Sequence, residues 1–195
     1  MNRVSVICTV HIEVEPCITV SVLHNILEHF QPDVIFLEMH STDFDHYFVN
    51  CSQHNLESRA VRRFRENHPQ VKLIPVDLPA QTADFISDVR RLDQTVGDLS
   101  SEYRELMRLD HARKLKHGFY YLSSDYCNEH WLKAYQETAI TVKRHVNPEC
   151  AGIYGRLVES NSVREKAMVE SIEKSLRENG PSNCVFLVGA AHRGA

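Results

Sequence analysis

The sequence predicts an α/β fold, in which a mainly parallel open sheet is flanked by helices. Short apolar runs rich in β-branched residues alternate along the chain with stretches whose apolar residues recur at helical spacing, as in βαβ units. Between about residues 80 and 147, by contrast, no strand-like run occurs. We therefore expect a helical insertion between the third strand and the last βα unit. Crossovers of βαβ units place helices on both faces of a parallel sheet.

The first part of the chain supplies three of the expected strands. Each run of β-branched or apolar residues ends at a turn or a polar stretch, and the Pro32-Asp33 turn separates the first helix from the second strand. The expected elements, in order, are a strand over 4–10, a helix over 18–30, a strand over 34–37, a helix near 53–67 and a strand over 71–76.

The last part of the chain predicts one more helix and strand. The Asn147-Pro148 pair and a loop around Gly152 and Gly155 are expected to break the helical pattern. Residues 162–165 have the S-x-x-E form of a capping box, so a helix is expected to begin there. Its apolar stripe ends at the Asn-Gly-Pro stop signal over 179–181, and residues 184–188 predict a buried strand.

Length and composition favour one domain over residues 1–195, with the insertion at about 80–147. The chain ends where a helix covering the last strand is expected, which suggests a C-terminal truncation. A net charge of -4 with scattered Lys and Arg argues against a nucleic-acid partner, and the absence of a long apolar stretch argues against a membrane anchor. Six widely spaced cysteines favour reduced thiols and a cytoplasmic location. The oligomeric state is left open.

Ionisable side chains follow every predicted strand at the point where the strand ends. They are His11, then Glu38 and His40, then Asp77, and finally His192. In open parallel sheets, ligands bind beyond the carboxyl ends of the strands. We therefore expect these side chains to converge on one polar site.

Arg164 is a further candidate, because a cation stands first in the stripe formed by Met168, Ile172 and Leu176. The helix expected to begin there would run antiparallel to the last strand, so its N-terminus would lie near His192. The start of the helix and the guanidinium of Arg164 would then both favour binding of an anion near His192, such as the oxyanion of a transition state. The alternative is that Arg164 reaches water or pairs with a carboxylate at the edge of the core.

Two imidazoles with a carboxylate suit a divalent metal such as Mn, Zn, Co or Fe. We therefore predict His11, Glu38 and His192 as metal ligands and, together with Arg164, as catalytic residues. A bound metal would supply hydroxide for hydrolysis of a small molecule or peptide. Without a metal, a histidine and a carboxylate could still activate water directly, and the sequence does not choose between the two.

Several enzyme classes are excluded by missing motifs. The sequence contains no HExxH, GxSxG, GxxxxGK or GxGxxG element. Their absence argues against zincin proteases, α/β-hydrolases, nucleoside-triphosphatases and dinucleotide enzymes.

The motifs resemble those of the superfamily of TraB, Tiki and erythromycin-esterase-like proteins, which is similar to the haem-binding ChaN proteins. That superfamily carries GxxH motifs after its first and last strands, a glutamate at the end of the strand that follows a Pro-Asp turn, and an arginine on the helix before the second GxxH motif. The matching segments are 8–11, 32–38, 76–79, 163–168 and 189–192. In the first of them, Cys8 stands where glycine is usual.

The resemblance implies a metal-dependent peptidase or an esterase-like hydrolase with histidine as general base, in which His40, Asp77 and Gly189 help to bind cofactor or substrate. Two other hypotheses stay open. The chain could bind a metal, haem or regulatory peptide without catalysis, which the Cys8 departure and the twelve histidines motivate. It could also be a degenerate copy that serves as an interaction module.

Overall fold

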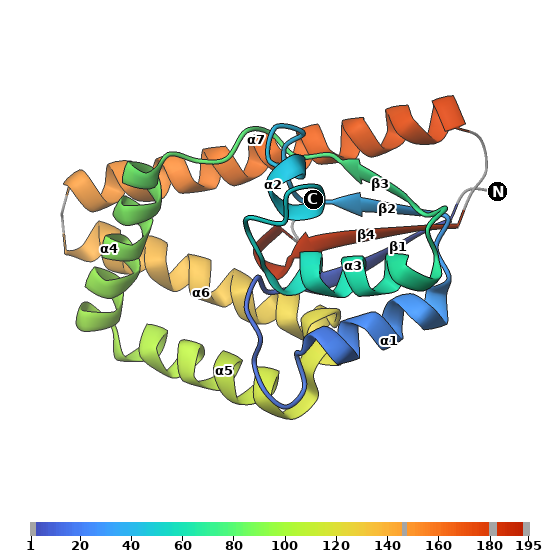
Figure 1. Ribbon diagram of the computed structural model, residues 1–195. Coiled ribbons are helices and arrows are strands. Elements are labelled where there is room, and N and C mark those ends of the chain that lie inside the picture. The colour runs from blue at the N-terminus through green and yellow to red at the C-terminus, as the bar shows by residue number, and fades with distance from the viewer. Residues whose placement is uncertain (1–2, 146–147, 180–182, 193–195) are drawn as a thin grey trace.

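The computed structural model describes residues 3–145, 148–179 and 183–192, and these form an α/β fold (Figure 1). The strands are β1 (Arg3–Thr9), β2 (Val34–Leu37), β3 (Lys72–Pro75) and β4 (Asn183–Gly189). The helices are α1 (Val20–Phe30), α2 (Phe44–Phe48), α3 (Leu56–Asn67), α4 (Ala83–Leu99), α5 (Ser101–Leu122), α6 (Asp125–Arg144) and α7 (Pro148–Asn179), and a 3-10 turn (Ala190–His192) follows β4.

All four strands are parallel and lie in the order β1-β4-β2-β3. The last strand therefore lies between the first and the second, where Cys184 pairs with both Val4 and Val34. Because the strands are parallel, their carboxyl ends meet at one edge of the sheet. The prediction of a parallel sheet flanked by helices is confirmed.

Local sequence explains where the first helices begin. The Thr19 side chain accepts a hydrogen bond from the backbone N–H of Val22 and caps α1. Asn55 and Ser58 form a reciprocal capping box at the start of α3. Helix α2 was not predicted, because five residues are too few to show helical periodicity.

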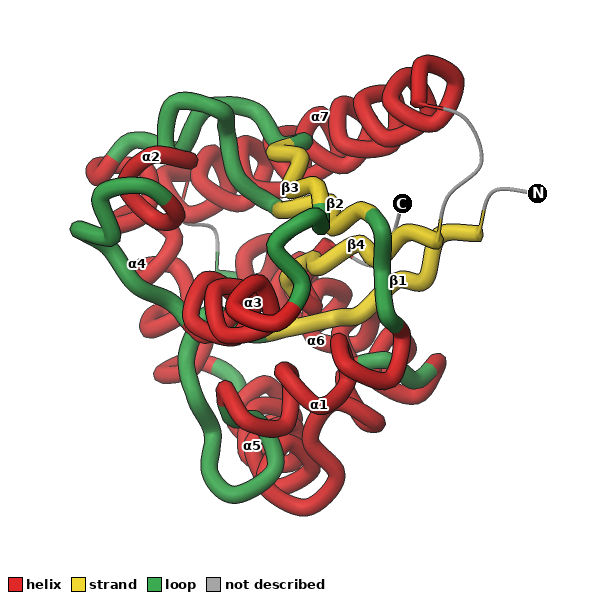
Figure 2. The backbone as a smooth tube through the Cα atoms, turned by 45° about the vertical axis from the view of Figure 1, so that its right-hand side comes forward, coloured by secondary structure: helices red, strands yellow, loops and turns green. Residues whose placement is uncertain are grey.

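Helices cover both faces of the sheet (Figure 2). Helices α1 and α3 lie on one side, and the second half of α7 lies on the other. Buried side chains of all three helices pack with the strands in one core, to which α7 contributes Met168 and Ile172. β4 is buried along nearly its whole length, as expected for a central parallel strand.

The segment expected to contain only helices does so, as α4, α5 and α6. These helices extend beside the sheet together with the first half of α7 (Figure 1). They enclose a second hydrophobic core, which includes Leu92, Tyr103, Ala134 and Ile153.

The expected helix break at Asn147-Pro148 is confirmed, since α6 ends at Arg144 and α7 begins at Pro148, but the expected loop around Gly152 and Gly155 and the helix start at Ser162 are wrong. Helix α7 runs continuously over Pro148–Asn179, so residues 152–155 form no loop and no helix begins at Ser162. Each helical glycine costs about 1 kcal/mol relative to alanine. Burial of Cys150 and Ile153 in the second core offsets that cost.

Some predicted features lie outside the described residues, namely the Gly180-Pro181 stop, Val146-Asn147, and the residues from 193 onward. Within the described part of the chain, none of the helices has both the length and the apolar character needed to cross a membrane.

Candidate functional site

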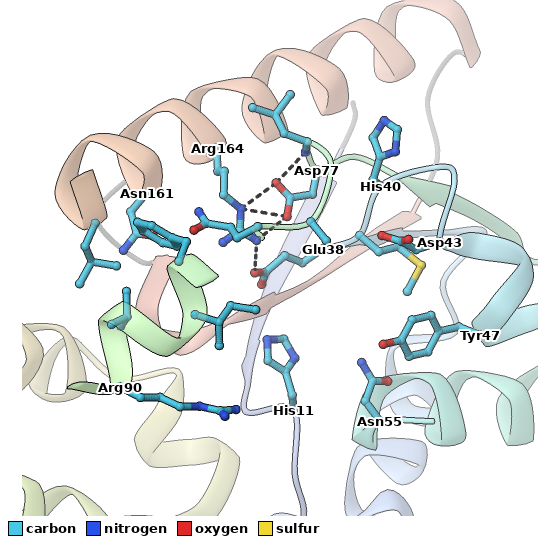
Figure 3. A pocket seen from close by; sticks show the side chains of 18 residues that line it. His11, Glu38, His40, Asp43, Tyr47, Asn55, Asp77, Arg90, Asn161 and Arg164 are labelled. Carbon is cyan, nitrogen blue, oxygen red and sulfur yellow. Dashed lines mark hydrogen bonds and ion pairs between the residues drawn. The ribbon is translucent and has the colours of Figure 1, made fainter. Parts of the chain in front are cut away.

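A cavity of about 550 Å³ opens at the carboxyl ends of the strands (Figure 3). Its walls come from the loops after β1, β2 and β3 and from α4 and α7. The predicted residues His11, Glu38, His40, Asp77 and Arg164 all line it. These side chains therefore gather at one edge of the sheet, as the strand-end rule predicts.

Arg164 is the centre of a buried ion network. Its Nε donates to both Asp77 carboxylate oxygens at 3.2 Å, and its Nη2 donates to Oε1 of Glu38 at 2.9 Å and, in a shorter contact, to Asp77 Oδ2. The Asp77 and Glu38 side chains are only 5% and 6% exposed. One guanidinium therefore balances two buried carboxylates, and burial lowers the pKa of Arg164 less than Asp77 and Glu38 raise it.

His192 is enclosed by the same network. Its Nε2 lies 2.9 Å from Nη1 of Arg164 and 3.3 Å from Oε1 of Glu38, and its Nδ1 lies 3.3 Å from Oε1 of Glu165. With its side chain 5% exposed, both ring nitrogens already have protein neighbours. In this arrangement His192 positions the other groups.

Glu38 forms the floor of the site next to Gly189. The backbone N–H of Gly189 donates to Oε2 of Glu38 in a short hydrogen bond. Burial by itself raises the pKa of Glu38, but the contacts with His192 and with Gly189 outweigh it and lower the pKa to about 2. Glu38 is therefore a fixed negative charge.

Gly189→Ala is expected to disturb this floor, because a Cβ there would lie 3.0 Å from Oε2 of Glu38, which cannot move away from its partners. We expect a loss of about 1–3 kcal/mol in unfolding free energy, typical of overpacking. Urea unfolding would measure it. In Gly97→Ala, a Cβ would meet nothing within 4 Å, so this helical control should gain up to about 1 kcal/mol. Equal behaviour of the two variants would contradict the prediction.

His11 has a different partner from the other strand-end residues. Its Nδ1 lies 3.2 Å from Oε1 of Glu57, which also accepts a hydrogen bond from the Thr9 hydroxyl at 2.5 Å. The Glu57 side chain is 9% exposed, whereas that of His11 is 57% exposed. No hydrogen-bond partner for Nε2 of His11 lies among the described residues, and Nε2 lies 3.7 Å from the point that a Cβ of Gly189 would occupy. The hydrogen bond with Glu57 is the main reason why the pKa of His11 rises to about 9.

Glu57 was not among the predicted site residues, although the chain carries a signal for it. It lies in the first turn of α3, and α3 leads into β3, so the start of this helix faces the carboxyl edge of the sheet. Helix N-termini also favour carboxylates.

His40 lines the cavity but does not join the cluster. Its Nδ1 lies 2.9 Å from the Thr42 hydroxyl, and in Figure 3 its ring lies apart from Glu38. A cofactor-binding role for His40 stays a prediction.

Arg164 reaches the site for a different reason from the expected one. It lies in the middle of α7, about half-way along a 32-residue helix, so the N-terminus of its own helix is not beside it. Arg164 instead pairs with the carboxylates of Glu38 and Asp77 at the edge of the core, which is the alternative considered above.

The predicted metal ligands do not fit a shared ion in this arrangement. Nη2 of Arg164 lies 2.9 Å from Oε1 of Glu38, and Nη1 lies 2.9 Å from Nε2 of His192, so a cation already contacts the atoms of both side chains that would have to bind the metal. His11 directs one nitrogen at Glu57. Over residues 3–145, 148–179 and 183–192, no group of three His, Cys, Asp or Glu side chains is arranged to hold a metal.

No protein-family model, curated protein or solved structure matches this chain. The resemblance to the superfamily of TraB, Tiki and erythromycin-esterase-like proteins therefore stays a prediction from the motifs alone.

Proposed function

We propose that the protein is a hydrolase of ester or amide bonds in which the His11–Glu57 pair activates water without a metal. The observation that carries this proposal is an imidazole held at Nδ1 by a buried carboxylate, with Nε2 unpartnered among the described residues, at the wall of a cavity of about 550 Å³. A histidine oriented by a carboxylate is the usual general base of such enzymes.

In the proposed reaction, neutral His11 accepts a proton at Nε2 from a water molecule, which attacks the carbonyl carbon of the substrate. Glu57 accepts a hydrogen bond from Nδ1–H throughout and stabilises the imidazolium that forms. His11 then donates the proton to the leaving oxygen or nitrogen as the scissile bond breaks. Arg164 lines the same cavity, but its guanidinium already balances Glu38 and Asp77, so we assign to it the positioning of Glu38 and not the stabilisation of the carbonyl oxygen.

The test uses p-nitrophenyl acetate, p-nitrophenyl butyrate and a set of blocked peptide p-nitroanilides as substrates. We expect saturable turnover that EDTA dialysis leaves unchanged. Loss of turnover on dialysis and its return with Mn²⁺ or Zn²⁺ would support the metal-dependent alternative instead. Absence of turnover on every substrate would contradict the proposal. We also propose that the substrate is a small molecule or a peptide and that the protein is located in the cytoplasm.

The pH dependence separates this mechanism from others. Only neutral His11 acts as a base, and its pKa is about 9, so kcat/KM should rise with pH and level off above about 9. In Glu57→Gln, the main cause of the raised pKa is gone, so the inflection should move down toward the ordinary value of 6.5 and the plateau should fall. An inflection that stays in place in Glu57→Gln would contradict the role of this pair.

A further inference from the structure

A second cavity of about 250 Å³ adjoins the proposed reaction cavity and shares Val89, Leu157 and Asn161 with it. Its walls come mainly from α4, α5, α6 and α7. The proposed hydrolytic mechanism makes no use of this cavity. Asn161, which is labelled in Figure 3 beside Arg164, marks the boundary between the two.

Four aromatic side chains line this second cavity: Tyr103, Trp131, Tyr135 and Tyr154. The Trp131 and Tyr135 ring centroids lie 6.4 Å apart with the planes tilted by 49°. We call this set of four residues the aromatic cage.

The tyrosine hydroxyls of the cage are already bound to protein groups. The Tyr103 hydroxyl donates to Oδ1 of Asp93 at 3.3 Å, and the Tyr154 hydroxyl donates to the Tyr135 carbonyl at 3.1 Å. The Tyr135 hydroxyl accepts from Nδ2 of Asn161 at 3.3 Å. The polar ends are thus fixed, and the rings are left to form the cavity wall.

The charge at the cage is negative. Asp93 lines it, and no Lys, Arg or His does so among the described residues. Lys114 approaches the Trp131 ring at 5.6 Å from its centroid, but it pairs with Asp110 at 2.5 Å. A group that binds here therefore meets aromatic rings and a carboxylate.

We propose that the aromatic cage binds an alkylammonium group, such as a trimethylammonium. Ring faces attract cations that are weakly hydrated, and cages of aromatic residues recognise quaternary ammonium ions in this way. Asp93 supplies the countercharge.

The adjoining cavities also define a substrate class, in a step that rests on the proposed function. A substrate with its ammonium in the aromatic cage would place the rest of the molecule past Asn161 and into the cavity that contains His11. Esters of amino alcohols have this layout. The binding site itself does not depend on catalysis.

Binding is tested with choline and its neutral isostere 3,3-dimethylbutanol, using calorimetry and the fluorescence of the single tryptophan, which is Trp131. We expect choline to bind at least about tenfold more tightly than the isostere, as cation–π contacts from several rings imply. Equal affinities, or no binding of either compound, would overturn the proposal.

Variants of residues that line the aromatic cage test whether choline binds there. Asp93→Asn keeps the shape of the side chain and removes its charge, and we expect it to weaken choline binding several-fold. Asp98→Asn, an exposed position on the same helix, should leave the affinity unchanged. Tyr154→Leu removes one ring and should also weaken binding, with thermal unfolding checking that the variant is folded. Choline affinity that both Asp93→Asn and Tyr154→Leu leave intact would overturn the assignment.

Hydrolysis separates this inference from the proposed function. Acetylcholine and 3,3-dimethylbutyl acetate differ in charge but not in shape, and we expect kcat/KM to be higher for acetylcholine. Asp93→Asn should remove this difference between the two esters. Selective choline binding without hydrolysis would support the cage and contradict the hydrolase. Hydrolysis of both esters at equal rates would contradict the cage as a substrate site and leave the hydrolase supported.

Discussion

Arg164→Gln is expected to lower the free energy of unfolding by about 3–5 kcal/mol at neutral pH, as breaking a buried ion pair does when one partner is removed. The guanidinium is the shared partner of Glu38, Asp77 and His192. Glutamine cannot balance two carboxylates that are only 5% and 6% exposed. Urea unfolding monitored by circular dichroism measures the change.

Arg177→Gln is the matched control on the same helix. Arg177 pairs with Glu173 at 3.6 Å, but both side chains are well exposed, so we expect a change of at most about 0.5 kcal/mol. Equal losses in the two variants would contradict the view that Arg164 holds the strand ends together.

The pH dependence of this loss has a definite sign. In the wild type, the pKa of Glu38 is lowered from 4.5 to about 2, so its contribution to stability is full above pH 4.5 and is lost as the pH falls through about 2. In Arg164→Gln, ionised Glu38 has lost the cation that balances it, and protonation of Glu38 at low pH removes that imbalance. The stability difference between the two proteins should therefore be largest above pH 4.5 and should narrow on acidification.

His11→Asn is expected to lower kcat/KM roughly 10²- to 10⁴-fold on the p-nitrophenyl esters, the usual cost of removing a general base. Asparagine retains a polar side chain next to Glu57 but cannot accept and release a proton. The His11 side chain is 57% exposed, so we expect stability to change little and the loss to be one of activity.

The control for this variant is His29→Asn, an exposed histidine of α1 that does not line the reaction cavity. Its activity should match that of the wild type. Activity of His11→Asn close to that of the wild type would contradict the proposed mechanism, whereas a loss of stability as large as that of Arg164→Gln would show that His11 has mainly a structural role.

The edge at which the candidate site lies could be predicted because strand ends are local features. Apolar runs end at His11, Glu38, Asp77 and His192, and parallel pairing brings strand ends to one edge whatever the order of the strands. That reasoning needs only the recognition of each strand and the expectation that the strands are parallel.

The error in α7 has an equally physical cause. Two glycines and an S-x-x-E segment are local signals for a break and a new start after Pro148. Burial of the face that carries Cys150 and Ile153 depends on α4, α5 and α6, which meet α7 only in the folded chain. Tertiary packing outweighed local preference there, and it placed Arg164 within a helix.

The sequence by itself determined the α/β class, the parallel strands and the edge at which the ionisable residues gather, because these follow from periodicity and from the geometry of βαβ units. Tertiary structure alone decided which groups pair. It brought Arg164 into contact with both Glu38 and His192, and it paired His11 with Glu57. Pairing depends on contacts at ångström distances between segments far apart in the chain, and neither spacing nor composition contains those distances.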